Sequence, residues 1–196
     1  MDRMIKVAMI RVPTIVDVSA STAPITPPLG LAYLRRVTDR FPTEVQVIDA
    51  VGAQPVFRKV EIGGADAYLL GQNVEEIIEE TSSDTDIMLI SCMFSQDWLY
   101  TRAIINGLKK KCRGALIIAG GEHITAAPDF SIQDTEGLDI CVLGEGEDTL
   151  TKILESYCAG DHYPQNLPGT VVRTSDGVRR NQGRRRIVGI DTIGWP

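Results

Sequence analysis

Short apolar runs recur along the chain at intervals that suit a repeat of strands and helices. They cover residues 5–10, 44–50, 87–94, 115–119 and 139–143. Runs of this length, rich in Ile, Val and Leu and bounded by turn residues, are typical of strands that are buried on both faces of a sheet. The pattern therefore predicts five core strands.

The segments between these runs carry apolar residues at helical spacing. Pro27 and Pro28 suit the first turn of a helix, and Asn73 to Glu76 form a capping box. The spacing predicts helices over 29–40, 73–80 and 98–113, a short helix around 129–133, and a last helix that includes 150–157 and stops near Gly160. A strand that is followed each time by a helix indicates a parallel sheet with right-handed crossovers.

We expect an α/β fold, a three-layer doubly wound (flavodoxin-like, Rossmann-like) sandwich around a five-stranded parallel sheet. In the strand order 2-1-3-4-5, the carboxyl ends of strands 1, 3, 4 and 5 flank one crevice. Two intervals do not fit the repeat, and we interpret both as irregular. They are the long loop 11–28 and the stretch 51–72, which Gly63-Gly64 and Gly71 interrupt.

The pattern changes after residue 160. Residues 167–174 and 178–182 flank a Ser175-Asp176-Gly177 turn, which predicts a β-hairpin appendage. We therefore expect one domain over 1–160, followed by a hairpin and linker over 161–196. The ending at Trp195-Pro196 has no closing element, which we interpret as a boundary to a further domain.

Charge and cysteine usage narrow the function classes. The 196 residues carry 26 acidic and 20 basic side chains, a formal net charge of −6, which argues against nucleic acid as the main partner. No apolar run is long enough to cross a bilayer and the N-terminus leads directly into a strand, so we expect a cytoplasmic protein without a membrane partner. The four cysteines form no C-x-x-C pair, which predicts no metal or iron–sulfur site in this chain.

Unusual residues gather at the predicted carboxyl ends of the strands. Ser91 is either a core hydroxyl or a group aimed into a cleft, and Gly120-Gly121 allow either a tight turn or close approach by a ligand. His123 is either a hydrogen-bonded structural residue or a ligand contact. Gly144-Glu-Gly-Glu147 follows the fifth strand. Their convergence on one crevice favours a binding site there.

The usual nucleotide ligands fit this crevice poorly. A dinucleotide site needs G-x-G-x-x-G after the first strand, which is absent, and the carboxylates of Gly144-Glu-Gly-Glu147 would repel phosphate. An FMN site would need glycines in the loop after the first strand, and a receiver site would need an acidic pair there. A larger and mostly neutral ligand fits better.

The ordered set of motifs resembles the N-terminal cobalamin-binding domain of cobalamin-dependent radical SAM enzymes. The resemblance covers nearly the whole chain. Its motifs are Pro27-Pro-Leu-Gly-Leu-Ala-Tyr-Leu34, Val47-Ile-Asp-Ala50, Ser91, Gly120-Gly-Glu-His-Ile-Thr125, Gly144-Glu-Gly-Glu147 and Pro168-Gly169.

The resemblance implies a Rossmann-like domain that holds cobalamin over the carboxyl ends of the strands, with the dimethylbenzimidazole tail tucked in beside them. No D-x-H-x-x-G motif is present, so no lower axial histidine is expected. The implied cofactor contacts are Thr14, Pro28, Leu29, Ser91, Met93, Gly120, Gly121, His123, Gly144, Glu145 and Gly146.

In that family a following domain carries a CxxxCxxC motif, whose [4Fe-4S] cluster binds S-adenosylmethionine. This cysteine triplet is missing here, so the resemblance implies a cobalamin-binding part of a methyltransferase-type enzyme, with the radical SAM domain supplied in cis or in trans. Two alternatives stay open. One is a flavodoxin-like sensor or carrier that binds FMN or a nucleotide, and the other is an interaction scaffold that uses the Arg-rich hairpin, which the run Arg184 to Arg186 follows.

Overall fold

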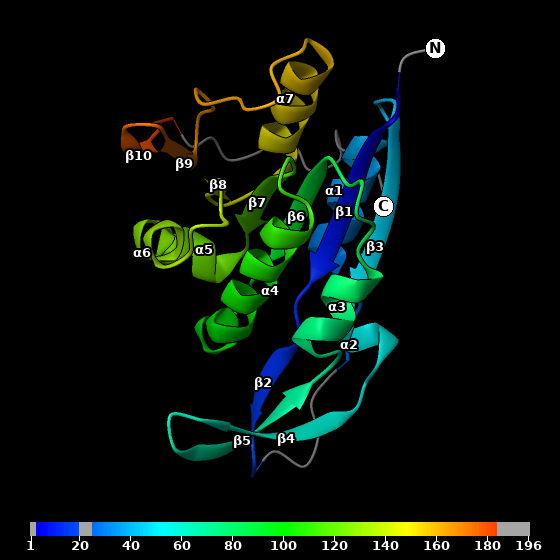
Figure 1. Ribbon diagram of the computed structural model, residues 1–196, viewed down its shortest axis with the longest axis vertical. Helices are drawn as coiled ribbons and strands as arrows, with labels where there is room; N and C mark the ends of the chain where they lie inside the picture. The colour runs from blue at the N-terminus through cyan, green and yellow to red at the C-terminus, as the bar shows by residue number, and fades with distance from the viewer. Residues whose placement is uncertain (1–2, 20–24, 184–196) are drawn as a thin grey trace.

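The computed structural model describes residues 3–19 and 25–183 and has a central seven-stranded sheet in the order β10-β9-β8-β7-β6-β1-β3 (Figure 1). Five neighbouring strands are parallel: β3 (Thr43–Asp49), β1 (Ile5–Arg11), β6 (Ile87–Ser91), β7 (Leu116–Gly120) and β8 (Ile140–Val142). Their order confirms the predicted doubly wound, flavodoxin-like α/β fold.

Helices cover both faces of this sheet (Figure 1). One face packs against α1 (Leu29–Thr38) and α7 (Glu147–Cys158). The other packs against α3 (Val74–Glu80), α4 (Trp98–Lys111), α5 (Glu122–Ala126) and α6 (Pro128–Asp134). Two short elements, α2 (Ala50–Ala53) and the 3-10 turn η1 (Ser95–Asp97), follow β3 and β6. No helix among these described elements is long and apolar enough to cross a membrane.

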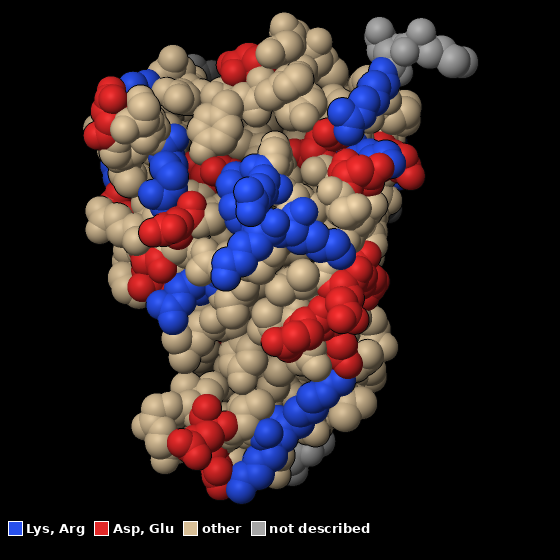
Figure 2. All heavy atoms as spheres, viewed as in Figure 1, with Lys and Arg blue, Asp and Glu red and all other residues tan. Residues whose placement is uncertain are grey.

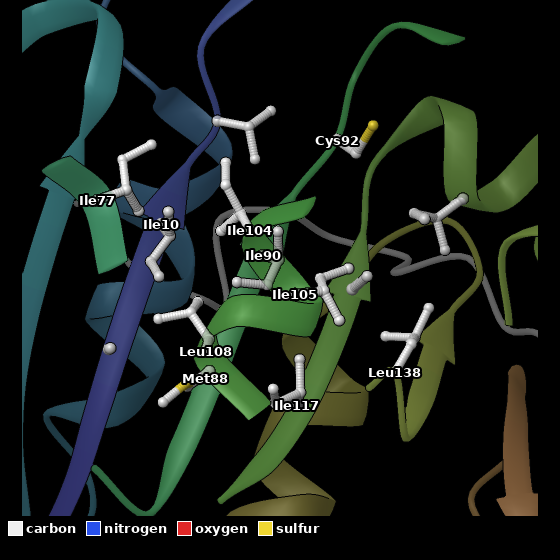
Figure 3. Close-up of a cluster of buried hydrophobic side chains, with 14 of the residues drawn as sticks. Ile10, Ile77, Met88, Ile90, Cys92, Ile104, Ile105, Leu108, Ile117 and Leu138 are labelled. Atoms are coloured by element: carbon white, nitrogen blue, oxygen red, sulfur yellow. The ribbon is translucent and has the colours of Figure 1, made fainter. Parts of the chain in front are cut away.

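Side chains of the central strands alternate between the two layers. In β6, Ile87 and Leu89 belong to the core under α1 and α7, whereas Met88 and Ile90 belong to the core under α4, which Figure 3 shows. All four are nearly inaccessible to solvent. This double burial explains the continuous apolar runs in the sequence. It also fixes the direction of the next residue, because Ser91 must face the α1 and α7 layer.

A second sheet overturns part of the sequence interpretation. Residues in the two intervals that we interpreted as irregular form an antiparallel sheet of β2 (Thr14–Asp17), β5 (Ala65–Leu70) and β4 (Phe57–Ile62). Gly63 and Gly64 both have positive φ, 60° and 83°, and they close the β4–β5 hairpin. Such glycine pairs are a hairpin signal, so interpreting them as breakers was wrong. In Figure 1 this small sheet lies beyond the carboxyl end of β1.

The small sheet is joined to the main body through η1. The Asp97 carboxylate, only 3% exposed, accepts hydrogen bonds from the Ile15 backbone N–H at 2.7 Å and from the Thr14 hydroxyl at 3.1 Å. Gln96 donates to the Ile15 carbonyl at 2.6 Å. Burial raises the pKa of Asp97 to about 6, against the weaker opposing effect of these hydrogen bonds. The joint is therefore held by a carboxyl group for which ionisation is costly.

The predicted C-terminal hairpin exists and continues the central sheet. β9 (Thr170–Thr174) pairs antiparallel with β8, and β10 (Gly177–Arg180) pairs antiparallel with β9. Val171 and Val172 are fully buried, so β9 also contributes to the core. The Arg184–Arg186 run and the Trp195-Pro196 ending lie outside the described residues.

Charged side chains on the α3 and α4 face occur in adjoining groups of opposite sign. Figure 2 shows acidic side chains over α3 and basic ones near the end of α4, where Lys109, Lys110 and Lys111 form the last turn. The Lys111 ammonium donates to the carbonyls of Ile78 and Glu79 near the end of α3. The basic turn therefore satisfies helix-end carbonyls, the place where cations are favoured.

Candidate functional site

A cavity of about 240 Å³ lies between the sheet and the helices α1 and α7, at the carboxyl ends of the parallel strands. Its walls are largely apolar and come from strands and both helices: Leu31, Leu34, Leu89, Ile118, Val142 and Leu150. Its other lining positions include small residues at strand ends and helix starts: Gly30, Ser91, Gly120, Gly121, Gly144 and Gly146. This is the crevice to which the sequence pattern pointed.

Ser91 and Gly120 are neighbours across two adjacent strands at the cavity edge. They are register partners in the parallel β6–β7 ladder. Leu89 and Ile118, two residues before them, pack in the core under α1 and α7. Because strand side chains alternate, Ser91 and Gly120 also face that layer.

The glycine pair after β7 has two distinct roles. Gly121 has φ +107°, and a Cβ there would lie 2.4 Å from the Cys92 carbonyl oxygen, so the backbone itself requires glycine. Gly120 has neither constraint, because the nearest atom to an added Cβ is the Val142 Cβ at 4.0 Å. The tight-turn interpretation therefore applies to Gly121, whereas Gly120 borders open space.

Gly30 is a second position where the protein does not need glycine. An added Cβ would have no atom within 4 Å, although Gly30 lies in the first turn of α1. Glycine in a helix costs up to about 1 kcal/mol relative to alanine. Gly30 is exposed and lines the cavity, so no protein contact explains this cost.

The turn after β8 places α7 against α1. Gly144 has φ +77°, and its N–H donates to the Thr125 hydroxyl at 2.9 Å. A Cβ on Gly146 would approach the Leu34 side chain at 3.3 Å, so this glycine lets the start of α7 pack close to α1. Glu147 begins α7 and lines the cavity, and its Oε2 is buried without a hydrogen-bond partner among the described atoms.

The structure brings together most, but not all, of the expected contact residues. Those that line the cavity are Ser91, Met93, Gly120, Gly121, Gly144, Glu145 and Gly146. Outside the lining, Thr14 bonds to Asp97, and Pro28 is the N-cap residue of α1. Leu29 is 60% exposed at the start of α1. The remaining expected contact, His123, is considered below.

Comparison with known proteins decides the family. The model of the B12 binding domain matches residues 15–154, which is most of the chain and includes the cavity. The chain belongs to the B12-binding domain family.

Two curated relatives of this B12-binding domain are methyltransferases by name. It is 25% identical over 195 residues to the uncharacterized methyltransferase PH0819 of Pyrococcus horikoshii, covering 99% of this chain and 38% of that protein. It is 27% identical over 154 residues to cytidylyl-2-hydroxyethylphosphonate methyltransferase of Streptomyces wedmorensis, covering 78% of this chain and 28% of that one. The chain thus spans well under half the length of either relative.

A solved structure shares the fold. It is that of the cobalamin-dependent S-adenosylmethionine radical enzyme OxsB with aqua-cobalamin bound, and the TM-score is 0.61. The match covers 93% of this chain and 23% of OxsB at 16% identity. At that identity the likeness establishes the B12-binding fold.

Neither histidine of this B12-binding domain lies in the cavity lining. His123, 5% exposed, makes hydrogen bonds to the Ser95 hydroxyl at Nδ1, 2.9 Å, and to the Ser131 hydroxyl at Nε2, 3.3 Å. Its ring lies 5.0 Å from the Trp98 ring, and burial lowers its pKa. His162 stacks on Tyr157, near the far end of α7. The environment of His123 is therefore that of a satisfied structural residue.

Sequence reasoning missed several lining residues of the B12-binding domain. They are Gly30, Leu31, Leu34, Glu122, Glu147 and Leu150, among others. Gly30 to Leu34 lie within the Pro27 to Leu34 motif, so the motif itself held the signal. Glu147 likewise lies within the Gly144 to Glu147 motif, but an acidic residue in the first turn of a helix also has a structural explanation.

Proposed function

We propose that this chain binds cobalamin, with the corrin ring across the carboxyl ends of the strands and the dimethylbenzimidazole tail in the cavity. No histidine of the chain would serve as the lower axial ligand. One observation carries the proposal. Gly30 and Gly120 line the cavity, and neither is required by a protein contact or by a positive φ. The space beside them is therefore available to a ligand.

The chemistry of the site supports this ligand over a flavin or a nucleotide. Leucine, isoleucine and valine side chains form the walls, which suits a flat and uncharged aromatic base. Glu122, Glu145 and Glu147 add carboxylates to the lining, and these would repel the doubly charged terminal phosphate of FMN more strongly than the singly charged phosphodiester of the cobalamin tail. Leu29, Met93 and Phe94 are exposed apolar side chains near the carboxyl ends of the strands. They offer contact area for the corrin ring.

The remaining expected contacts would act at the corrin edge. In this proposal, Thr14 contributes through the start of the small sheet, and Pro28 and Leu29 contribute through the start of α1. His123 would act indirectly, because its bond to Ser95 fixes η1, which follows Met93 and Phe94. The chain would thus bind and orient the cofactor and shield one side of it from water.

We infer that the chain is the cobalamin-binding part of a radical SAM methyltransferase-type enzyme. The names of the two relatives and of the OxsB structure support this inference. When bound, cobalamin supplies a cobalt centre that can carry a methyl group. A [4Fe-4S] cluster and S-adenosylmethionine would belong to a C-terminal radical SAM domain, in cis or in trans. Residues 1–160 would form the cobalamin-binding domain and 161–196 the hairpin and linker.

Titration with hydroxocobalamin, desalting and a visible spectrum test the proposal. We expect stoichiometric retention of the corrin by the wild-type chain. Gly120→Val, which fills the cavity from a strand position that accepts a β-branched residue, should abolish retention without unfolding the protein. Gly114→Val is the matched control, because Gly114 lies just before the other end of β7 and a Cβ there has no atom within 4 Å. Failure of the wild type to retain corrin, or retention of FMN instead, would contradict the proposal.

A further inference from the structure

The last residues of four parallel strands form one row along the carboxyl edge of the sheet. Arg11 of β1 is the register partner of Asp49 in β3 on one side and of Ser91 in β6 on the other. Ser91 is in turn the partner of Gly120 in β7. Register partners in a parallel sheet point to the same face, so the whole row faces the α1 and α7 layer. Ser91 and Gly120 line the cavity, and the Arg11–Asp49 pair lies next to it in the same row.

Arg11 joins this row to the segment that precedes α1. Its Nη1 donates to the Thr26 carbonyl at 2.7 Å and to the Asp49 Oδ1 at 3.3 Å, and its side chain is 21% exposed. The Gly52 N–H donates to the same Asp49 oxygen at 3.0 Å, so the carboxylate is held from the α2 side as well. Charge-assisted hydrogen bonds of this kind are stronger than those between neutral groups. The guanidinium is thus fixed by the sheet and in turn fixes the chain at Thr26.

The start of α1 has little else to hold it. Its N-cap residue, Pro28, makes no side-chain cap hydrogen bond, and the first turn contains no acidic residue. The backbone hydrogen bonds to Pro27 and Pro28 are local, from the Leu29 N–H at 2.9 Å and the Ala32 N–H at 3.1 Å. Gly30 further weakens the helix at this end. We therefore expect the first turn to depend on a contact from outside the helix.

Two prolines transmit the position of Thr26 to the wall of the cavity. The rings of Pro27 and Pro28 restrict φ, so the chain between Thr26 and the first turn of α1 has few conformations. Gly30 and Leu31 follow directly and line the cavity, as does Leu34 one turn later. A shift of Thr26 would therefore move the α1 wall relative to the sheet.

We propose that Arg11 is a positioning residue for the cofactor. Held by Asp49, it fixes the start of α1 and keeps the α1 wall of the cavity where the cobalamin tail requires it. The assignment rests on the proposed function. Arg11 acts through the helix and not through contact with the ligand. The Asp49 carboxylate, which lies in the Val47 to Ala50 motif, acquires a role as the support of this arginine.

The test removes the guanidinium and follows both the helix start and the ligand, using the full chain. Arg11→Met keeps an unbranched side chain and loses every donor. In the ligand-free protein, the backbone amides of residues 32–34 should exchange with deuterium about 10-fold faster than in the wild type. The Kd for hydroxocobalamin should rise about 10-fold, as expected when one hydrogen bond from a charged donor is lost. Arg11→Lys, which keeps a cationic donor, should recover a large part of both effects.

Arg36→Met is the matched control, because Arg36 lies near the other end of α1, is exposed and pairs with Asp39 at 3.4 Å. It should keep the wild-type exchange at 32–34 and the wild-type Kd. Unchanged exchange or unchanged Kd in Arg11→Met would overturn the assignment, and a higher Kd without faster exchange would show that Arg11 contacts the ligand directly. An Arg11→Lys variant no better than Arg11→Met would overturn it too. A wild type that does not bind hydroxocobalamin contradicts the proposed function and the assignment with it, whereas the other outcomes contradict the assignment alone.

Discussion

At the two edges of the parallel sheet, the buried carboxylates of Asp139 and Glu147 have opposite hydrogen-bonding environments. At the amino edge, Asp139 is 4% exposed and accepts hydrogen bonds from the Lys109 ammonium at 2.7 Å, the Ile117 N–H at 2.8 Å and the Tyr163 hydroxyl at 2.8 Å. At the carboxyl edge, the Oε2 of Glu147 is buried without a partner, and Gly30 and Gly120 leave space open. The satisfied Asp139 carboxylate helps to hold the fold at the amino edge, whereas the carboxyl edge keeps open space beside its glycines, at the edge where such sheets bind ligands.

Asp139→Ala should give the largest effect, and on stability alone. Loss of the carboxylate leaves the Lys109 ammonium and the Tyr163 hydroxyl without their partner, which we expect to cost about 3 kcal/mol in the free energy of unfolding. Urea denaturation measures this cost. Asp84→Ala, which removes an exposed ion pair with Lys6 near the same edge, serves as the control. If Asp139→Ala were no less stable than this control, the amino edge would lose its structural role.

Gly121→Ala and Gly120→Ala should separate stability from binding at adjacent positions. Alanine at 121 must adopt φ near +107° with its Cβ against the Cys92 carbonyl, so we expect a loss of at least about 2 kcal/mol. Alanine at 120 should keep full stability and weaken cobalamin retention. Thermal unfolding and the desalting spectrum distinguish the two. Equal destabilisation by both substitutions would contradict the distinct roles of the pair.

We expect the free energy of unfolding to depend on pH through Asp97, which joins the small sheet to the main body. Because the folded-state pKa is raised to about 6, its contribution is fully present below the unfolded pKa, near 4, and is lost as the pH rises through 6. The wild type should lose on the order of 1–2 kcal/mol more than Asp97→Asn between pH 4.5 and 7. Urea denaturation at both pH values gives the difference. Parallel pH profiles would show that Asp97 does not titrate in this range.

Gly30→Ala should give the smallest effect on stability and an opposite effect on binding. Alanine favours the helix by up to about 1 kcal/mol, and its Cβ enters open space, so the Tm should rise slightly. The same methyl group takes up cavity volume, and cobalamin retention should fall. Gly114→Ala, outside the cavity, should leave retention unchanged. A variant with higher Tm and full retention would show that the ligand does not reach Gly30.

The sequence predicted those strands correctly whose burial on both faces gives a continuous apolar run. The run at Ile87 to Ser91 predicted a strand buried on both faces, because it carries apolar residues in both alternating positions. The small sheet was missed because its strands are short and only partly buried. In β4, exposed Phe57, Lys59 and Glu61 interrupt the half-buried positions over six residues, too few for a clear period beside two glycines.

The candidate site was predicted only as far as strand ends determine it. Ser91, Gly120 and Gly144 follow directly from the ends of three strands. The open space beside Gly30 and the missing partner of the Glu147 Oε2 appear only in the three-dimensional structure. His123 shows the reverse case, because its partners Ser95 and Ser131 come from other segments and no spacing in the sequence reveals them.

The hairpin that extends the sheet also determines on which side of the molecule the chain emerges. β9 starts beside the carboxyl end of β8, where Thr170 pairs with Val142, and runs back toward the amino edge. β10 reverses again, so that the Asn181 N–H bonds to the Thr170 carbonyl. The number of added strands decides this, because a single added strand would have ended at the opposite edge of the sheet. With two, the described part of the chain reaches Gly183 at the carboxyl edge of the sheet, the edge at which the cavity lies.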